Sequence, residues 1–176
     1  MKVGGTISGA IFSEDRRFRY ALWRRWENSP KNLDTLLFIG LNPSTANATR
    51  DDPTVVRLIN FAKSWGFGGL FVGNLFSLIS PNPAPLFLGE SPELPGGPND
   101  KALLNMRLLS TVVMVGWGEF GQYAGTRPAE VLDLVCDPVH CIKMNQSGEP
   151  SHPLYLPGNS KLIRYYPKGD YRKGAT

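Results

Sequence analysis

Asn42, Asn74 and His152 carry the functional groups best suited to chemistry in this sequence. An asparagine amide both donates and accepts hydrogen bonds, so Asn42 and Asn74 can orient a water molecule or read the edge of a planar ring. The neutral imidazole of His152 can donate a hydrogen bond to negative charge that forms on a leaving group. Each residue also has a plainer interpretation, because asparagines form turns and a single loop histidine often has no chemical role.

Two adjacent carboxylates, Asp51 and Asp52, offer acid–base groups. Asp52 precedes Pro53, which favours a helix that begins here, with the carboxylate accepting hydrogen bonds from the free N–H groups of the first turn. Asp51 then remains free to face a binding pocket or water. The sequence leaves open whether either carboxylate takes part in chemistry.

The glycines at 116, 118 and 121 spell G-x-G-x-x-G, a pattern typical of loops that bind dinucleotide phosphates. A cofactor enzyme that uses this triplet is therefore one alternative. However, residues 122–127 do not begin a clean helix, which a dinucleotide site requires. The glycines more simply allow Trp117 to approach a ligand closely, so we expect no cofactor.

Cys136, His140, Cys141 and His152 are the residues that come nearest to a zinc site. Their spacing does not match structural zinc sites, and neighbouring strand residues point to opposite faces, so we expect no metal. Two cysteines also cannot form a disulfide framework. A reduced protein in the cytoplasm is the resulting expectation.

Apolar runs at 36–40, 70–73, 111–115 and 139–144 predict four buried strands. Helical patterns separate them, beginning at Asp52–Pro53, near Asn99 or Asp100, and at Pro128. This alternation predicts a three-layer α/β/α fold around a mostly parallel, four-stranded sheet. Ahead of it we expect a short hairpin over 10–20 and a helix over 19–26, and residues 80–98 read as a long surface loop.

In such folds, ligands bind beyond the carboxyl ends of the strands. The segments found there are GLNPST (40–45), GNLFS (73–77), GWGEFG (116–121) and GEPSHPLYL (148–156). We therefore expect these four loops to ring one pocket. Besides the three residues named first, they supply further candidate binding residues: Ser44, Phe76, Trp117, Tyr155 and Leu156.

Length and composition indicate one globular domain of 176 residues, with an N-terminal extension over 1–30, a core over 34–156 and a basic tail over 157–176. No apolar run approaches the ~20 residues of a membrane span, and no secretory signal is evident. The net charge of +4 permits an anionic partner. Basic residues mixed with aromatic ones near both ends suit nucleic acid, although they also fit a solvated helix face and a frayed tail.

Nearly the whole chain resembles a bacterial and phage family, the domain-of-unknown-function family 1643. The matching stretches are Arg19-Tyr20, LNPSTA (41–46), DDPT (51–54), NLFS (74–77), GWG (116–118) and GEPSHPLYL (148–156). This resemblance implies no established reaction.

The order of the motifs also resembles the uracil-DNA glycosylase superfamily, in its branch with asparagine in the first motif. The matching residues are Gly40-Leu41-Asn42-Pro43, Asn74, Trp117-Gly118 and His152-Pro153. This resemblance implies a glycosylase-like fold. It further implies that Asn42 positions the attacking water, that Asn74 binds the edge of a flipped base, and that His152 stabilises charge on the departing base.

The same resemblance implies that Leu156 fills the gap left in the base stack, and that Phe76 or Trp117 stacks on the base. The expected function is nucleobase binding, within DNA, with hydrolysis of the N-glycosidic bond. The main alternative is a non-catalytic module that binds nucleic acid or a nucleotide at the same pocket.

Overall fold

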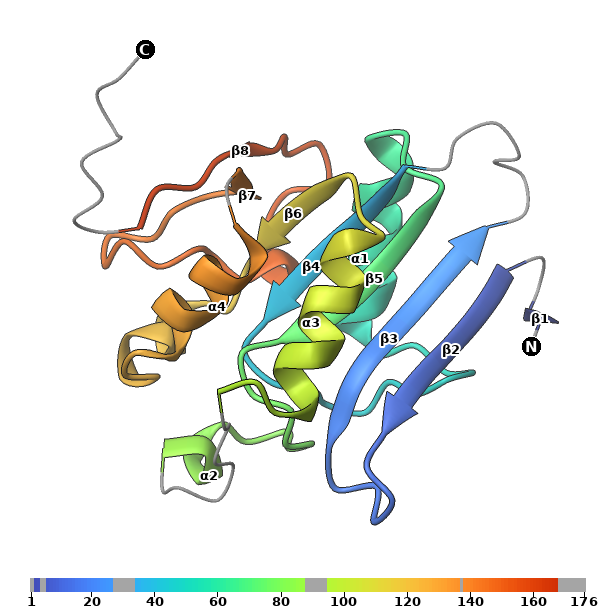
Figure 1. The fold of residues 1–176 in the computed structure, drawn as a ribbon. Coiled ribbons are helices and arrows are strands. Elements are labelled where there is room, and N and C mark those ends of the chain that lie inside the picture. Colours follow the sequence, from blue (N-terminus) through green and yellow to red (C-terminus); the bar gives the residue numbers. More distant parts are fainter. Residues whose placement is uncertain (1, 4–5, 27–33, 88–94, 137, 168–176) are drawn as a thin grey trace.

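The computed structural model describes residues 2–3, 6–26, 34–87, 95–136 and 138–167. Its centre is one eight-stranded sheet with the strand order β1-β2-β3-β5-β4-β6-β7-β8 (Figure 1). The protein is therefore of the mixed α/β class, as the alternation of strand and helix patterns predicts.

The four predicted strands form the parallel centre of the sheet. They are β4 (Thr35–Gly40), β5 (Gly69–Asn74), β6 (Val112–Val115) and β7 (Val139–Cys141). β4 pairs in parallel with both β5 and β6, and β6 pairs in parallel with β7. The prediction of a mostly parallel, four-stranded sheet is nevertheless wrong in extent, because antiparallel strands lengthen this centre at both edges.

The helix expected over 19–26 is wrong, because this segment is the strand β3 (Arg19–Trp26). β3 forms a hairpin with β2 (Thr6–Phe12), and its other edge pairs antiparallel with β5. Its backbone groups thus find partners in the strands on both sides. Trp23 lies opposite Gly9 in the hairpin, where its ring occupies the space that a side chain at position 9 would need.

Short strands complete both edges of the sheet. β1 (Lys2–Val3) pairs with β2, and β8 (Ile163–Arg164) pairs antiparallel with β7. Part of the segment expected to be a basic tail therefore belongs to the sheet.

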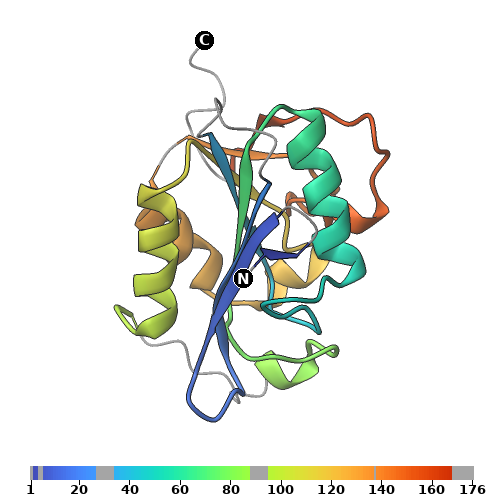
Figure 2. The same cartoon turned by 90° about the vertical axis from the view of Figure 1, so that its right-hand side faces the viewer.

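Helices cover both faces of the sheet, as Figure 2 shows edge-on. On one face lies α1 (Pro53–Ser64); on the other lie α3 (Pro98–Leu108) and α4 (Arg127–Val135). Asp52 caps α1 as predicted. α3 is capped by Gly97 and not by Asn99 or Asp100, and α4 begins one residue before Pro128. A short helix, α2 (Ala84–Phe87), lies in the described part of the loop expected over 80–98.

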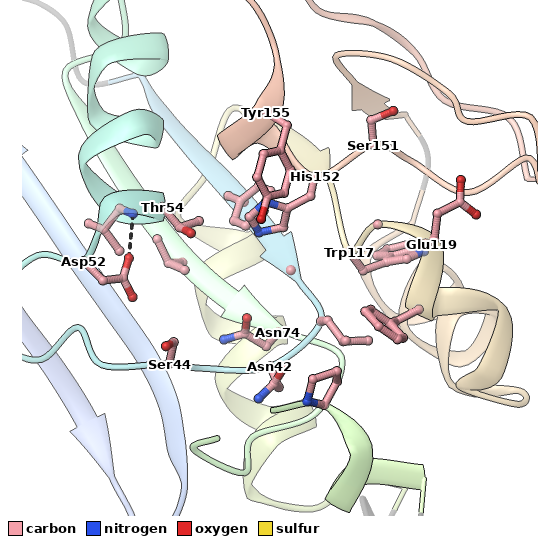
Figure 3. A pocket seen from close by; sticks show the side chains of 18 of the residues that line it. Asn42, Ser44, Asp52, Thr54, Asn74, Trp117, Glu119, Ser151, His152 and Tyr155 are labelled. Carbon is pink, nitrogen blue, oxygen red and sulfur yellow. Dashed lines mark hydrogen bonds between the residues drawn. The ribbon is translucent and has the colours of Figure 1, made fainter. Parts of the chain in front are cut away.

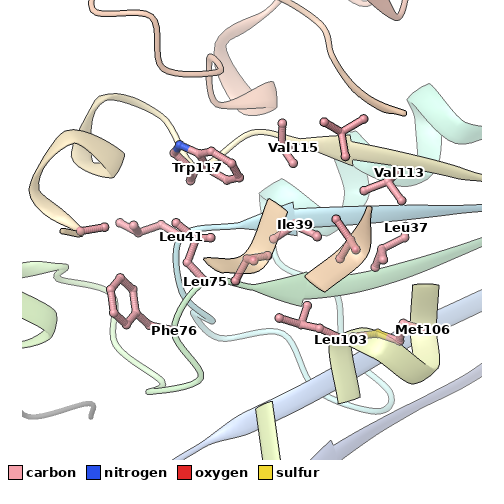
Figure 4. Packing of buried hydrophobic residues seen from close by; sticks show 14 of the residues in the cluster. Leu37, Ile39, Leu41, Leu75, Phe76, Leu103, Met106, Val113, Val115 and Trp117 are labelled. Atoms are coloured by element: carbon pink, nitrogen blue, oxygen red, sulfur yellow. The ribbon is translucent and has the colours of Figure 1, made fainter. Parts of the chain in front are cut away.

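Alternate residues of β4, β5 and β6 pack into two hydrophobic clusters. Leu36 and Phe38 of β4 face α1, whereas Leu37 and Ile39 face α3 and α4 (Figure 4). Burial on both faces explains why this strand is apolar without interruption. Among the described helices, none combines the length and the apolarity needed to cross a bilayer.

Candidate functional site

A cavity of about 650 Å³ lies at the carboxyl ends of β4, β5 and β6, where the four loops were expected to meet (Figure 3). Its volume falls in the range of small-molecule sites. The loops that follow β4 and β6 line it, together with the end of β5 and the segment 143–156. Seven predicted site residues line this cavity: Asn42, Ser44, Asn74, Trp117, His152, Tyr155 and Leu156.

The amide of Asn42 is oriented by the loop that follows β5. Its Nδ2 donates to the carbonyl oxygens of Pro43, Leu78 and Ser80, at 3.1, 3.3 and 2.8 Å. The hydrogens of the amide nitrogen are therefore already bonded to the protein. The Oδ1 atom has no hydrogen-bond partner among the described residues, so it is left to accept a hydrogen bond from a ligand or a water molecule in the cavity.

Asn74 ends β5 directly opposite Gly40, the last residue of β4. A Cβ atom at position 40 would lie 3.0 Å from Asn74 Oδ1, so glycine there leaves room for the amide. The side chain of Asn74 is buried and makes no hydrogen bond within the described part of the chain. Its backbone carbonyl accepts a hydrogen bond from Asn99 Nδ2 at 3.2 Å, which holds the end of the strand in place. Both polar ends of this amide are thus available to a ligand.

His152 lies across the cavity from Asn42 and Asn74 in Figure 3. Its Nδ1 accepts a long hydrogen bond, 3.4 Å, from the backbone N–H of Leu154, as the cap of the short 3₁₀-helix η2 (Pro153–Tyr155). This bond assigns the proton of the neutral ring to Nε2. Burial lowers the pKa of His152, and the nearby charge of Asp52 opposes that shift only in part. The ring is therefore a neutral hydrogen-bond donor at neutral pH.

The two aspartates separate, and the structure corrects the role expected for Asp51. Asp51 does not line the cavity, because it pairs with Arg24 at 2.7 Å beside a small, separate depression. Asp52 lines the cavity and also caps α1, since its Oδ1 accepts from Val55 N at 2.9 Å and its Oδ2 from Ala46 N at 3.3 Å. Both oxygens of this carboxylate are thus occupied by backbone N–H groups.

The aromatic residues also divide between core and cavity. Phe76 is part of the hydrophobic core and does not line the cavity, which removes it as a stacking residue. Trp117 lines the cavity with only 2% of its surface exposed, and its Nε1 donates to Glu149. Phe120, which the sequence analysis missed, lines the cavity and is 49% exposed.

The glycine triplet has a packing role. A Cβ atom at Gly116 would contact Phe38 at 2.8 Å, and one at Gly121 would contact Trp117 at 2.2 Å. The residues that follow form the 3₁₀-helix η1 (Glu119–Tyr123) and not the α-helix of a dinucleotide site. The protein's own side chains thus occupy the space that the glycines leave.

Several polar residues that sequence reasoning missed complete the cavity wall: Arg19, Thr54, Ser80, Lys143, Asn145 and Ser151. Ser151 donates to Asn145, which ties the two sides of the loop after β7. The sequence did offer one signal for Arg19, because Arg19-Tyr20 is one of the stretches that resemble the family. No group of three or more His, Cys, Asp or Glu residues in the described ranges is placed to hold a metal ion.

Fold and site together define a mixed α/β protein with a polar ligand cavity at the carboxyl edge of its parallel strands. Residues 19–154 match the family described as protein of unknown function (DUF1643), and the chain belongs to this family. The matched range contains Arg19, Asn42, Asn74 and His152. No curated protein and no solved structure matches the chain significantly. The glycosylase-like fold therefore stays a prediction from the order of the motifs.

Proposed function

We propose that this protein binds a nucleobase, within DNA, in the cavity and hydrolyses its N-glycosidic bond. The observation that carries the proposal is the meeting of Asn42, Asn74 and His152 around one cavity. Each contributes a hydrogen-bonding group that the described residues leave unused. A planar base offers acceptors and donors on its edge, which suit the amide of Asn74.

The proposed reaction uses these groups in one displacement. The oxygen of a water molecule, held by Asn42 Oδ1, bonds to the C1′ carbon of the sugar, and the bond between C1′ and the base nitrogen breaks. The electron pair of that bond stays on the base, where the Nε2–H of His152 stabilises the negative charge. The proton that the water loses passes to solvent and finally to the base. Asn42 orients the water and accepts no proton.

Aromatic residues at the cavity opening support a DNA substrate. Tyr155 is 83% exposed and Phe120 is 49% exposed, and both line the cavity. Leu156, by contrast, packs partly against the cluster under α1. Tyr155 is thus better placed than Leu156 to enter a base stack from which a nucleotide has been extruded, and Phe120 to stack on the extruded base. A cytoplasmic location remains part of this proposal.

The experiment is a base-release assay on oligonucleotides that contain uracil, hypoxanthine, alkylated bases or hypermodified bases. Product is detected as alkali-labile sites in the DNA. We expect the native protein to release at least one of these bases, and Asn42→Ala and His152→Ala each to lower the rate at least about a hundredfold. Asn82→Ala and His140→Gln, which alter the same residue types outside the cavity, should retain activity.

An absence of base release across the whole panel would contradict the proposed hydrolysis. The same holds if Asn42→Ala and His152→Ala, shown to be folded by circular dichroism, retained the native rate. Either result would favour the alternative below.

The alternative is a non-catalytic module that binds a nucleobase or nucleotide in the same cavity. It is favoured by the state of Asp52, the carboxylate that lines the cavity, because both of its oxygens already accept backbone N–H groups, which makes it a weaker base. The two functions differ in one measurement. A module binds modified oligonucleotides, with an affinity that falls with salt, and never produces a free base.

A further inference from the structure

Arg19 is the first residue of β3, and only 3% of its surface is exposed, yet it lines the ligand cavity. Its Nη1 donates to the carbonyl oxygen of Ala46 at 2.8 Å. This is the sole hydrogen bond of the guanidinium to the described residues. The Nε atom is buried and has no partner there.

The charge of Arg19 also has no ion-pair partner in the described ranges. Asp52 is near enough to act on it electrostatically, but both oxygens of that carboxylate are directed to backbone N–H groups. Burial lowers the pKa of Arg19 to about 10, which still leaves the side chain charged at neutral pH. A buried charge without a partner is costly, so its retention needs an explanation.

The other two buried arginines of the described chain provide the comparison. Arg24 pairs with Asp51 at 2.7 Å, and Arg127 pairs with Asp100 at 2.6 Å. Neither lines the large cavity. The arginine that faces this cavity is thus the one whose counter-ion the described chain does not supply.

The unused donors of Arg19 have a defined shape. The Nε and Nη2 hydrogens lie along one edge of a guanidinium and match the two oxygens of a carboxylate or phosphate. The bond from Arg19 to Ala46 and the bond from Ala46 to Asp52 connect the guanidinium to the start of α1, where the Asp52 carboxylate already accepts from backbone N–H groups. The hydroxyl residues Ser44 and Thr54 line the cavity as well.

We propose that the ligand of this cavity carries an oxyanion, a carboxylate or a phosphate, which binds the guanidinium of Arg19. The proposal deepens the proposed function, because it rests on the cavity being the ligand site, but it does not depend on bond cleavage. The substrate is then an acidic one: either a base modified with a carboxylate or a nucleotide whose own phosphate reaches Arg19.

Calorimetric titration with paired probes tests this proposal. One pair is a nucleoside and its 5′-monophosphate, and the other is uracil and uracil 6-carboxylate. We expect the native protein to bind the charged member of at least one pair about tenfold to a hundredfold more tightly. The pair that shows the preference identifies the oxyanion as phosphate or carboxylate.

Variants assign the preference to Arg19. Arg19→Gln should abolish the preference for the charged probe, and Arg19→Lys should reduce it, because an ammonium cannot bond two oxygens along one edge. Arg24→Gln is the matched control: it removes a buried arginine of the same strand that already has a partner. We expect it to lower the melting temperature while the preference remains.

The proposal is overturned if the native protein shows no preference for either charged probe. It is also overturned if folded Arg19→Gln or Arg19→Lys keeps the full preference, or if Arg24→Gln loses it equally. These outcomes are independent of the base-release assay. A protein that binds the charged probe through Arg19 but releases no base would refute the hydrolysis alone.

Discussion

Hydrogen bonds to the backbone orient the two principal candidate residues, Asn42 and His152, and decide which of their atoms are left for a ligand. In Asn42 the amide nitrogen is bound by three carbonyl groups, so the oxygen is left for a ligand. In His152 the Nδ1 atom accepts from Leu154, so the Nε2 proton is left for a ligand. Residue types alone did not determine this division, because each side chain has two different ends.

The burial of His152 predicts that the protein loses folding stability in acid. Burial lowers the pKa of His152 below its ordinary 6.5, with Asp52 as the opposing influence. In acid, the unfolded chain therefore binds a proton at this residue before the folded protein does. The contribution of this residue to folding stability is fully present above about pH 6.5 and is lost progressively as the pH falls below that value. His152→Asn should lose less stability over the same interval, as measured by urea denaturation at several pH values.

Proton magnetic resonance of the imidazole provides the direct check. A His152 resonance that titrates at or above 6.5 in the folded protein would contradict the prediction. The neutral form of the ring, on which the assignment of the Nε2 donor depends, would then be wrong at neutral pH.

Asp52, at the N-terminal end of α1, contacts both the helix and a loop that lines the cavity. Asp52 caps the helix through Val55 and also binds the backbone of Ala46, which in turn binds Arg19. One carboxylate thus holds the start of a helix, the loop after β4 and the position of a buried arginine. The sequence predicted the cap, but the bond to Ala46 depends on how the intervening loop folds.

Removal of this cap is therefore expected to affect both stability and the site. Asp52→Ala should lower the free energy of unfolding by about 1 to 2 kcal/mol, because two backbone N–H groups lose their acceptor. Asp52→Asn keeps an oxygen for Val55 and should cost less. Urea denaturation of the two variants checks this order, and an equal cost for both would show that the hydrogen bonds of Asp52 do not set the helix start.

At the scale of the whole molecule, a buried ion pair holds α3 and α4 against the end of β5. Arg127 of α4 pairs with Asp100 of α3 at 2.6 Å and also donates to the carbonyl oxygen of Leu75 at 2.8 Å. Asn99 donates to the carbonyl oxygens of Asn74 and Leu75. The two helices on one face of the sheet thereby hold the strand end that presents Asn74 to the cavity.

Breaking this pair should be costly. Arg127→Met leaves the buried carboxylate of Asp100 without its counter-ion, with the N–H of Gly96 still donating to it, and we expect a loss of about 3 to 5 kcal/mol in the free energy of unfolding. The double variant Arg127→Met/Asp100→Leu should recover much of that loss, since no charge remains buried. Glu130→Gln is the control, because its contact with Arg127 is longer, 3.6 Å, and exposed, and it should change stability by less than about 1 kcal/mol.

Thermal or urea unfolding of the three proteins measures these differences. If the double variant were less stable than Arg127→Met, the pair would stabilise the fold through something other than its charges.

The parts of the fold that were predicted correctly depend on local patterns. Burial on both faces makes residues 36–40 and 70–73 apolar without interruption, and the Asp52–Pro53 pair marks a helix start wherever it occurs. The segment 19–26 misled because its basic and aromatic residues suit a helix face as well as a strand. Its conformation is decided by β2 and β5, which pair with it along both edges.

The candidate site was also predictable only in part. That Asn42, Asn74 and His152 line one cavity could be predicted because each follows or lies near a recognisable strand end, and such ends share one edge of a parallel sheet. Asp51 and Phe76 lie outside this cavity, because neighbours in sequence can point to different places: Asp51 turns to Arg24 and Asp52 to the cavity. No local pattern distinguishes those two directions.

By itself, then, the amino-acid sequence determined the alternation of strands and helices and the edge at which its polar loops gather, because hydrophobic periodicity and capping act over a few neighbouring residues. Only the tertiary structure decided that Arg19 enters the cavity without a counter-ion from the described chain, and which end of each amide or imidazole faces a ligand. Those outcomes depend on contacts between segments far apart in the chain, such as Arg19 with Ala46 and Asn42 with Ser80.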